Sequence, residues 1–210
     1  MTIFDLIFLL SCLALIVTIA RVLYLFARGR SSLGARALRR LSGLLVVYTI
    51  ALFTAALVQP AKTVGIGVPV CFDDFCVAID SAARWSRIGD VARGDFVVVS
   101  GRVISKAGGR RQREPDVYGV LLDGTGNRYR VSDRGEAALR RIGLAGANLT
   151  DFVDPMSANA FKLAFEVPAD ARSLAFITGH GVFPNALIIG NAQSPFHKPV
   201  MVPLCGGNCD

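Results

Sequence analysis

Two cysteines lie five positions apart in the stretch GVPVCFDDFCVAID, residues 67–80, with a pair of aspartates between them. Cys205 and Cys209 form a second close pair far along the chain. Four cysteines in two pairs suit three kinds of chemistry: disulfide bonds, a tetrahedral zinc site or a redox-active dithiol. As disulfides they allow three pairings, and sequence spacing does not select among them.

The spacing of the cysteines disfavours the metal and redox alternatives. C-x4-C with C-x3-C departs from the C-x2-C spacing of zinc knuckles, although Asp73, Asp74 or His197 could replace one thiolate. A redox pair typically has C-x-x-C spacing in a βαβ unit, and both are missing. Disulfides are therefore favoured if the domain lies in an oxidising compartment. The predicted disulfide cysteines are Cys71, Cys76, Cys205 and Cys209.

Other residues offer little catalytic or metal chemistry. The sequence has two histidines and no G-x-S-x-G, H-E-x-x-H or G-x-x-x-x-G-K motif. Asp73 and Asp74 are adjacent, so in a strand they would point to opposite faces. Asp123, Thr125 and Asn127 resemble the start of a calcium loop, but the distal glutamate of that loop is missing. We therefore predict no enzymatic activity, no metal and no cofactor.

The elements that carry these residues begin with two apolar runs. The chain is 52% hydrophobic and 19% charged, which is too apolar on average for an ordinary soluble domain. Residues 3–25 contain only two charged side chains, and residues 42–58 contain none before Pro60 ends the run. The first run is too long for a signal peptide, and the start MTIFD lacks the positive charge of one. We predict transmembrane helices over residues 1–27 and 42–59.

Basic residues between the two runs set the predicted orientation. Residues 28–41 contain five arginines and no acidic residue, and short basic flanks of this kind stay in the cytoplasm. We therefore predict a cytoplasmic connector there and an extracytoplasmic location for everything after Pro60. Residues 1–60 hold 6 Lys and Arg against 1 Asp, whereas residues 61–210 hold 17 Lys and Arg against 15 Asp and Glu. Most of the net charge of +7 therefore comes from the basic residues that set the membrane orientation. It does not indicate a nucleic-acid surface, so nucleic acid is not a predicted partner.

The rest of the chain shows the period-two alternation of β-strands. We predict a linker over residues 60–67, a β-domain over 68–195 and a cysteine-containing tail over 196–210. Residues 133–143 form the one predicted helix, with Asp133 as its N-cap. Seven short strands with frequent turns indicate an all-β antiparallel sandwich. These strands fall within residues 75–80, 94–105, 116–123, 128–132, 160–168, 173–181 and 186–190.

One loop of this β-domain is strongly basic. The segment KAGGRRQRE brings together Lys106, Arg110, Arg111 and Arg113. A solvated hairpin tip is the simplest interpretation of such a loop. The functional alternative is a contact with an anionic surface, such as lipid headgroups or a wall polymer.

The order of several segments resembles a known group of bacterial domains. CFDDFCVAI, GDFVVVSGRVIS, VLLDGTGNRYRVS and AFKLAFEVPADA follow one another in this sequence. This order is similar to bacterial immunoglobulin-like extracytoplasmic domains of unknown function, which include the mycobacterial immunoprotective extracellular antigen fold. The resemblance covers residues 68–190 and implies an immunoglobulin-like β-sandwich in an exposed location. It supplies no catalytic residue to carry over.

Together these features predict a membrane-anchored, extracytoplasmic binding or structural module of the cell envelope. Its expected partners are the membrane, through two spans, and a protein or an envelope polymer. Two alternatives remain open: a zinc-binding or redox-sensing envelope protein that uses the four paired cysteines, and an accessory subunit of a membrane complex.

Overall fold

The computed structural model describes residues 3–90, 92–181 and 198–204. Cys205, Cys209 and His197, and the strand predicted at 186–190, lie outside these residues. The described chain divides into two compact units, one containing the residues before 61 and the other containing residues 61–181 and 199–204.

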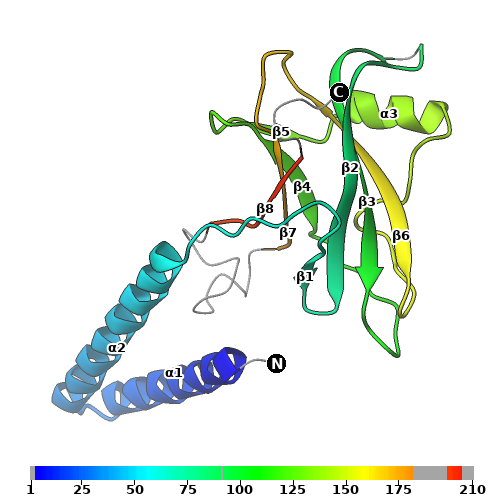
Figure 1. Ribbon diagram of the computed structural model, residues 1–210. Helices are drawn as coiled ribbons and strands as arrows, with labels where there is room; N and C mark the ends of the chain where they lie inside the picture. The colour runs from blue at the N-terminus through cyan, green and yellow to red at the C-terminus, as the bar shows by residue number, and fades with distance from the viewer. Residues whose placement is uncertain (1–2, 91, 182–197, 205–210) are drawn as a thin grey trace. The chain divides into compact units, whose positions relative to one another are not determined.

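The first unit is a pair of helices, α1 (Ile3–Ala27) and α2 (Ser31–Val58) (Figure 1). Only residues 28–30 separate them, because residues 31–41 contain no proline and continue into α2, with Gly34 accommodated inside the helix. The predicted boundary at residue 42 therefore falls inside a continuous helix. Gly34 lies against the Phe26 ring, where an added Cβ would come within 3.0 Å of the ring carbons.

Both helices are apolar and long enough to cross a bilayer, judged by length and composition. Very little of either candidate span is buried. A core helix of a soluble protein would instead hide such side chains from solvent. Large apolar side chains are exposed along α1 and α2, among them Leu9, Leu13, Ile16, Leu23, Leu44, Val47 and Val58. The predicted pair of apolar N-terminal helices is therefore confirmed.

The second unit is a sandwich of two four-stranded antiparallel sheets, which confirms the predicted fold class. Figure 1 shows the two sheets facing one another. The first sheet has the order β1-β2-β3-β6, formed by Val70–Phe72, Phe75–Ile88, Ala92–Ser105 and Ala158–Glu166. The second has the order β5-β4-β7-β8, formed by Arg128–Arg130, Tyr118–Leu122, Ala175–Gly179 and Met201–Pro203.

Strand β3 is buried on both faces, which explains its continuous apolar run FVVV. Val97 and Val99 point into the core between the sheets. Phe96 and Val98, at the alternate positions, point to the outer face under helix α3 (Asp133–Arg141). The main core also contains large side chains from both sheets, including Phe75, Phe161, Phe165, Leu121 and Phe176.

Two segments that we predicted to lie outside the sandwich belong to it. Thr63, in the predicted linker, pairs with Met201, and the Val64 amide donates to the Met201 carbonyl at 3.0 Å. Met201 begins strand β8, so the predicted tail contributes an edge strand. In this strand Val202 is buried and Pro203 is exposed, as edge strands allow. The alternation of apolar and other residues in MVPL was the sequence signal for this strand. Pro203 obscured the signal, because proline in a short run argues against a strand.

Helix α3 is confirmed, but its predicted N-cap is wrong. Ser132 is the cap, because its backbone is extended and its Oγ accepts from the Gly135 amide at 3.2 Å. The Glu136 carboxylate then accepts from the backbone amide of Ala164 in β6 at 3.1 Å. Gly135 permits this close approach, since an added Cβ would come within 2.6 Å of the Ala164 Cβ.

Candidate functional site

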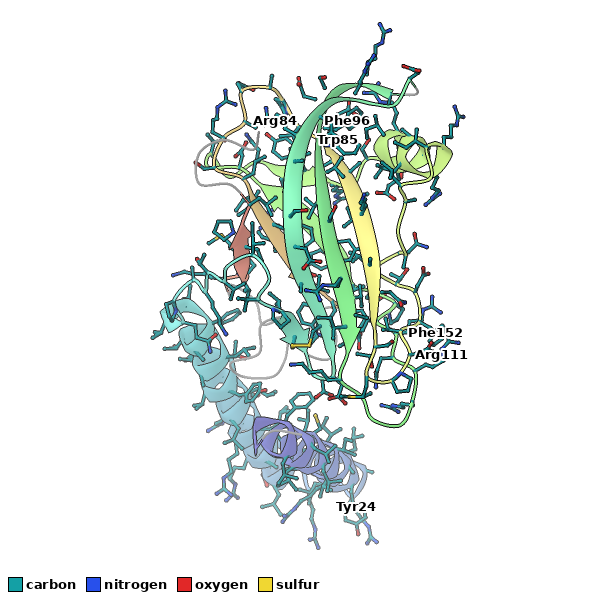
Figure 2. The ribbon with its side chains drawn as sticks, turned by 45° about the vertical axis from the view of Figure 1, so that its right-hand side comes forward. Tyr24, Arg84, Trp85, Phe96, Arg111 and Phe152 are labelled. Atoms are coloured by element: carbon teal, nitrogen blue, oxygen red, sulfur yellow. A yellow bond between two sulfur atoms is a disulfide. The ribbon has the colours of Figure 1, made fainter. Side chains whose placement is uncertain are left out.

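The two ends of the sandwich carry different kinds of side chains. We define the turn end by helix α3, the β4–β5 turn and the segment 167–174. We define the loop end by the β1–β2 turn and the segments 106–117 and 148–157. Figure 2 shows Arg84, Trp85 and Phe96 toward one end and Arg111 and Phe152 at the other.

A disulfide at the loop end answers the question raised by the first cysteine pair. Cys71 and Cys76 are direct cross-strand partners in the β1–β2 hairpin and are joined by a disulfide bond. Asp73 has a φ of 59°, so the two aspartates form the turn and do not lie in a strand. Cys71 is exposed, whereas Cys76 is fully buried. The Lys106 ammonium lies 3.4 Å from Cys71 Sγ, beside the exposed sulfur.

This bond changes what the cysteines can do. While Cys71 and Cys76 are joined, neither provides the thiolate that zinc requires. The structure does not test the predicted role of Cys205 and Cys209, which lie outside the described residues. Within the described ranges, no group of three or more His, Cys, Asp or Glu is placed to hold a metal ion. His180 packs against the Phe72 ring, with 4.7 Å between ring centroids.

At the turn end, Asp123 organises the β4–β5 turn. This residue is only 6% exposed, and its carboxylate accepts five hydrogen bonds of 2.7–2.9 Å. The Thr125 amide and hydroxyl and the Asn127 amide donate to Oδ1. The Asn127 side-chain amide and the Tyr129 hydroxyl donate to Oδ2. We noted Asp123, Thr125 and Asn127 only as a partial calcium motif, but together with Tyr129 their spacing, D-x-T-x-N-x-Y, was the signal for this network.

The electrostatics of Asp123 follow from these donors. Hydrogen bonds from Thr125 above all, and then from Asn127 and Tyr129, hold the pKa of this carboxyl far below its usual value despite its desolvation. The hydrogen bond that Tyr129 donates to Asp123 raises the pKa of the Tyr129 hydroxyl. Because both carboxylate oxygens face hydrogen-bond donors, this turn does not present the free oxygens that calcium needs. Asp123 therefore has a structural role.

The four predicted basic residues differ in their contacts. Lys106 lies beside the disulfide, whereas Arg111 and Arg113 stack on Phe152. Their guanidinium carbons lie 5.2 and 5.3 Å from the centroid of the Phe152 ring, within the range of cation-π attraction. Arg110 is exposed. The arrangement on the loop end is therefore aromatic as well as basic.

A second segment, which we did not predict as part of the site, holds the basic loop in place. Gln112 and Val153 form an antiparallel bridge with two hydrogen bonds of 2.9 Å. Arg113 Nε donates to the Thr150 carbonyl at 3.0 Å, and Arg111 forms an ion pair with Asp154 at 2.8 Å. The basic loop is therefore a docked segment of the loop end and not a free hairpin tip.

Comparisons with known proteins concern the fold. The sequence matches no protein-family model and no curated protein. MPT63, a secreted protein from Mycobacterium tuberculosis, has a similar structure at 10% identity and a TM-score of 0.44, over 69% of this chain and 98% of that one. An uncharacterized β-sandwich protein from Clostridium difficile gives 8% identity and a TM-score of 0.40, over 70% and 96%. A conserved hypothetical protein from Bacillus anthracis gives 9% and 0.44, over 54% and 88%.

Proposed function

We propose that this chain is a membrane-anchored module that presents its β-sandwich outside the cytoplasm and acts by binding, without catalysis. The two apolar helices are the anchor, and the sandwich is the presented part. The proposal accounts for a chain in which an exposed apolar helix pair and an ordinary close-packed β-domain are joined.

The observation that carries the proposed orientation is the placement of the arginines of the helix pair. Arg28 and Arg30 lie at the connection between α1 and α2, and Arg36, Arg39 and Arg40 lie in the first turns of α2. Basic residues that flank membrane spans favour the cytoplasmic side. Both remaining helix ends, and the sandwich that follows α2, then belong on the other side. The Cys71–Cys76 disulfide supports this location, because disulfides persist in oxidising compartments.

The loop end supports binding as the activity. Arg111, Arg113 and Phe152 are residue types enriched at protein interfaces, and they are held in place by neighbouring backbone groups. Asp123, whose pKa is strongly lowered, is fully occupied by its own turn. The zinc alternative loses two of its four proposed ligands to the disulfide.

The proposed orientation can be tested by labelling thiols in intact cells with a membrane-impermeant maleimide. The full chain, with Cys12, Cys205 and Cys209 replaced by serine, carries one new cysteine at Gly108 or at Ser32. Gly108 is an open position in the basic loop, and Ser32 is exposed in the first turn of α2. We expect the Gly108→Cys chain to be labelled in intact cells and the Ser32→Cys chain only after permeabilisation. The reverse pattern would refute the orientation, and recovery of the chain in the soluble fraction would refute the anchor.

A further inference from the structure

The loop end exposes two large apolar side chains that the sandwich does not cover. Phe152 is 49% exposed and Met156 is 73% exposed. They belong to the same segment, which hydrogen-bonds to the basic loop through Val153 and Met156. Phe, Met and Arg are enriched where proteins dock, so the composition of this surface is that of an interface.

The backbone at Met156 strengthens this interpretation. Asp154, Pro155, Met156 and Ser157 form a turn in which the Ser157 amide donates to the Asp154 carbonyl at 3.3 Å. Met156 has a φ of 53°, at the turn position where glycine is expected. A non-glycine residue in this region carries conformational strain, which tends to occur at functional sites. Here the strained residue presents a large apolar side chain to solvent.

The charges around the apolar pair are mixed and not uniformly positive. Arg110, Arg111 and Arg113 are offset by Asp151 and Asp154 from the facing segment. Recognition of anionic lipid typically uses about four to eight uncompensated basic residues, so a lipid surface fits poorly. A surface that holds both signs around an apolar centre allows the self-complementarity that a two-fold interface requires.

The charged groups are also held in position. Arg113 is fixed by the Thr150 carbonyl and by the Phe152 ring, and Arg111 by the same ring and by Asp154. The side chains of Arg111 and Asp154 nevertheless remain 61% and 69% exposed, so a partner can reach them. Groups that are ordered before binding lose less entropy on association.

From these observations we infer that the loop end docks against the loop end of a second copy of this chain. Phe152 and Met156 of the two copies meet near the two-fold axis. Arg111 of each copy faces Asp154 of its partner, so each exposed ion pair is exchanged across the interface. The inference does not depend on the proposed membrane orientation, although copies that share one bilayer would meet at a higher effective concentration.

The test is the oligomeric state of the full chain in detergent micelles, measured by sedimentation velocity over a concentration series. We expect a reversible dimer. Met156→Gly removes the apolar side chain while relieving the positive φ, and it should weaken dimerisation by roughly tenfold or more, as a hot-spot residue does. Its melting temperature should equal or exceed that of the wild type, which separates lost contact from lost folding. Phe152→Ser should also weaken the dimer.

Charge exchange gives a second measurement. Arg111→Asp and Asp154→Arg should each weaken the dimer, because like charges then face one another across the axis. The chain with both substitutions should recover dimerisation. Arg128→Gln with Arg130→Gln, at exposed positions of β5, is the matched control and should leave the dimer unchanged.

Three results would overturn the inference. The wild type could remain monomeric throughout the series, or it could form a dimer that Met156→Gly and Phe152→Ser leave intact, which would place the interface elsewhere. A monomeric chain in phosphatidylcholine nanodiscs that binds added phosphatidylglycerol vesicles through Arg111 and Arg113 would identify lipid as the occupant. The maleimide labelling above is independent of all three results.

Discussion

The turn end and the loop end of the sandwich both cover the core, but they differ in how their polar and apolar side chains are paired or exposed. At the turn end, polar groups find partners within the chain: Asp123 accepts five hydrogen bonds, and the Arg84 guanidinium donates to the carbonyls of Ala169 and Ala171. At the loop end, Phe152 and Met156 remain exposed beside the solvent-exposed ion pair of Arg111 and Asp154. The difference teaches that the turn end satisfies its polar groups within the chain, whereas the loop end leaves large apolar and charged side chains on its surface.

The largest loss of stability is expected at Gly135 in the turn end, where no space is left for a side chain. Gly135→Val should lower the free energy of unfolding by about 3 kcal/mol, because the added side chain would overlap Ala164 and separate α3 from β6. Unfolding in urea can be followed by fluorescence of Trp85, the single tryptophan, which packs against the cluster under α3. Ala137→Val, on the exposed face of the same helix, is the control and should cost less than about 1 kcal/mol. Equal losses from the two substitutions would mean that α3 is not tightly docked.

A smaller effect is expected from the disulfide at the loop end. Replacing both Cys71 and Cys76 by serine should lower the free energy of unfolding by about 2 kcal/mol, because the bond closes only a short loop in the unfolded chain. The same urea titration measures it. Cys12→Ser, in helix α1, is the control and should leave the unfolding of the sandwich unchanged. A loss as large as that of Gly135→Val would show that the loop end contributes to stability as much as the turn end.

The smallest effect concerns the response of the turn end to acid. The folded-state pKa of Asp123 is lowered, so its stabilising contribution is present above the unfolded pKa of about 4 and is lost as the pH falls below it. Tyr129→Phe removes one of the hydrogen bonds that lower this pKa. The variant should therefore lose stability less steeply than the wild type below pH 4. Thermal unfolding over a pH series compares the two slopes, and identical slopes would exclude Tyr129 from the acid response.

Period-two patterns were enough to predict the sandwich and most of its strands, because alternating burial leaves a direct trace in sequence. GDFVVVSGRVIS and AFKLAFEVP became β3 and β6 within two residues at each end. The predictions were less complete where few residues carried the pattern. Strand β8 has three residues and contains a proline, and residues 81–88 of β2 hold polar side chains that obscured its extension.

The candidate site was only partly predictable, because it depends on segments that meet in space. The basic loop was visible as a run of arginines, but its partners Thr150, Phe152 and Asp154 lie about 40 residues away along the chain. The Cys71–Cys76 pairing was one of three alternatives, since sequence does not show which cysteines face each other across two strands. The cap at Ser132 was missed because two adjacent residues were both suitable caps.

The pairing of Thr63 with Met201 has a consequence for the order in which the domain forms. A chain that emerges from its amino terminus presents Thr63 first, whereas β8 follows only after nearly all of the sandwich has been made. Pairings between such distant residues form slowly. Until β8 arrives, the edge of β7 has no partner, and an open strand edge invites association with other chains. During synthesis of this domain, the edge of β7 therefore stays open until residues 201–203 have been made.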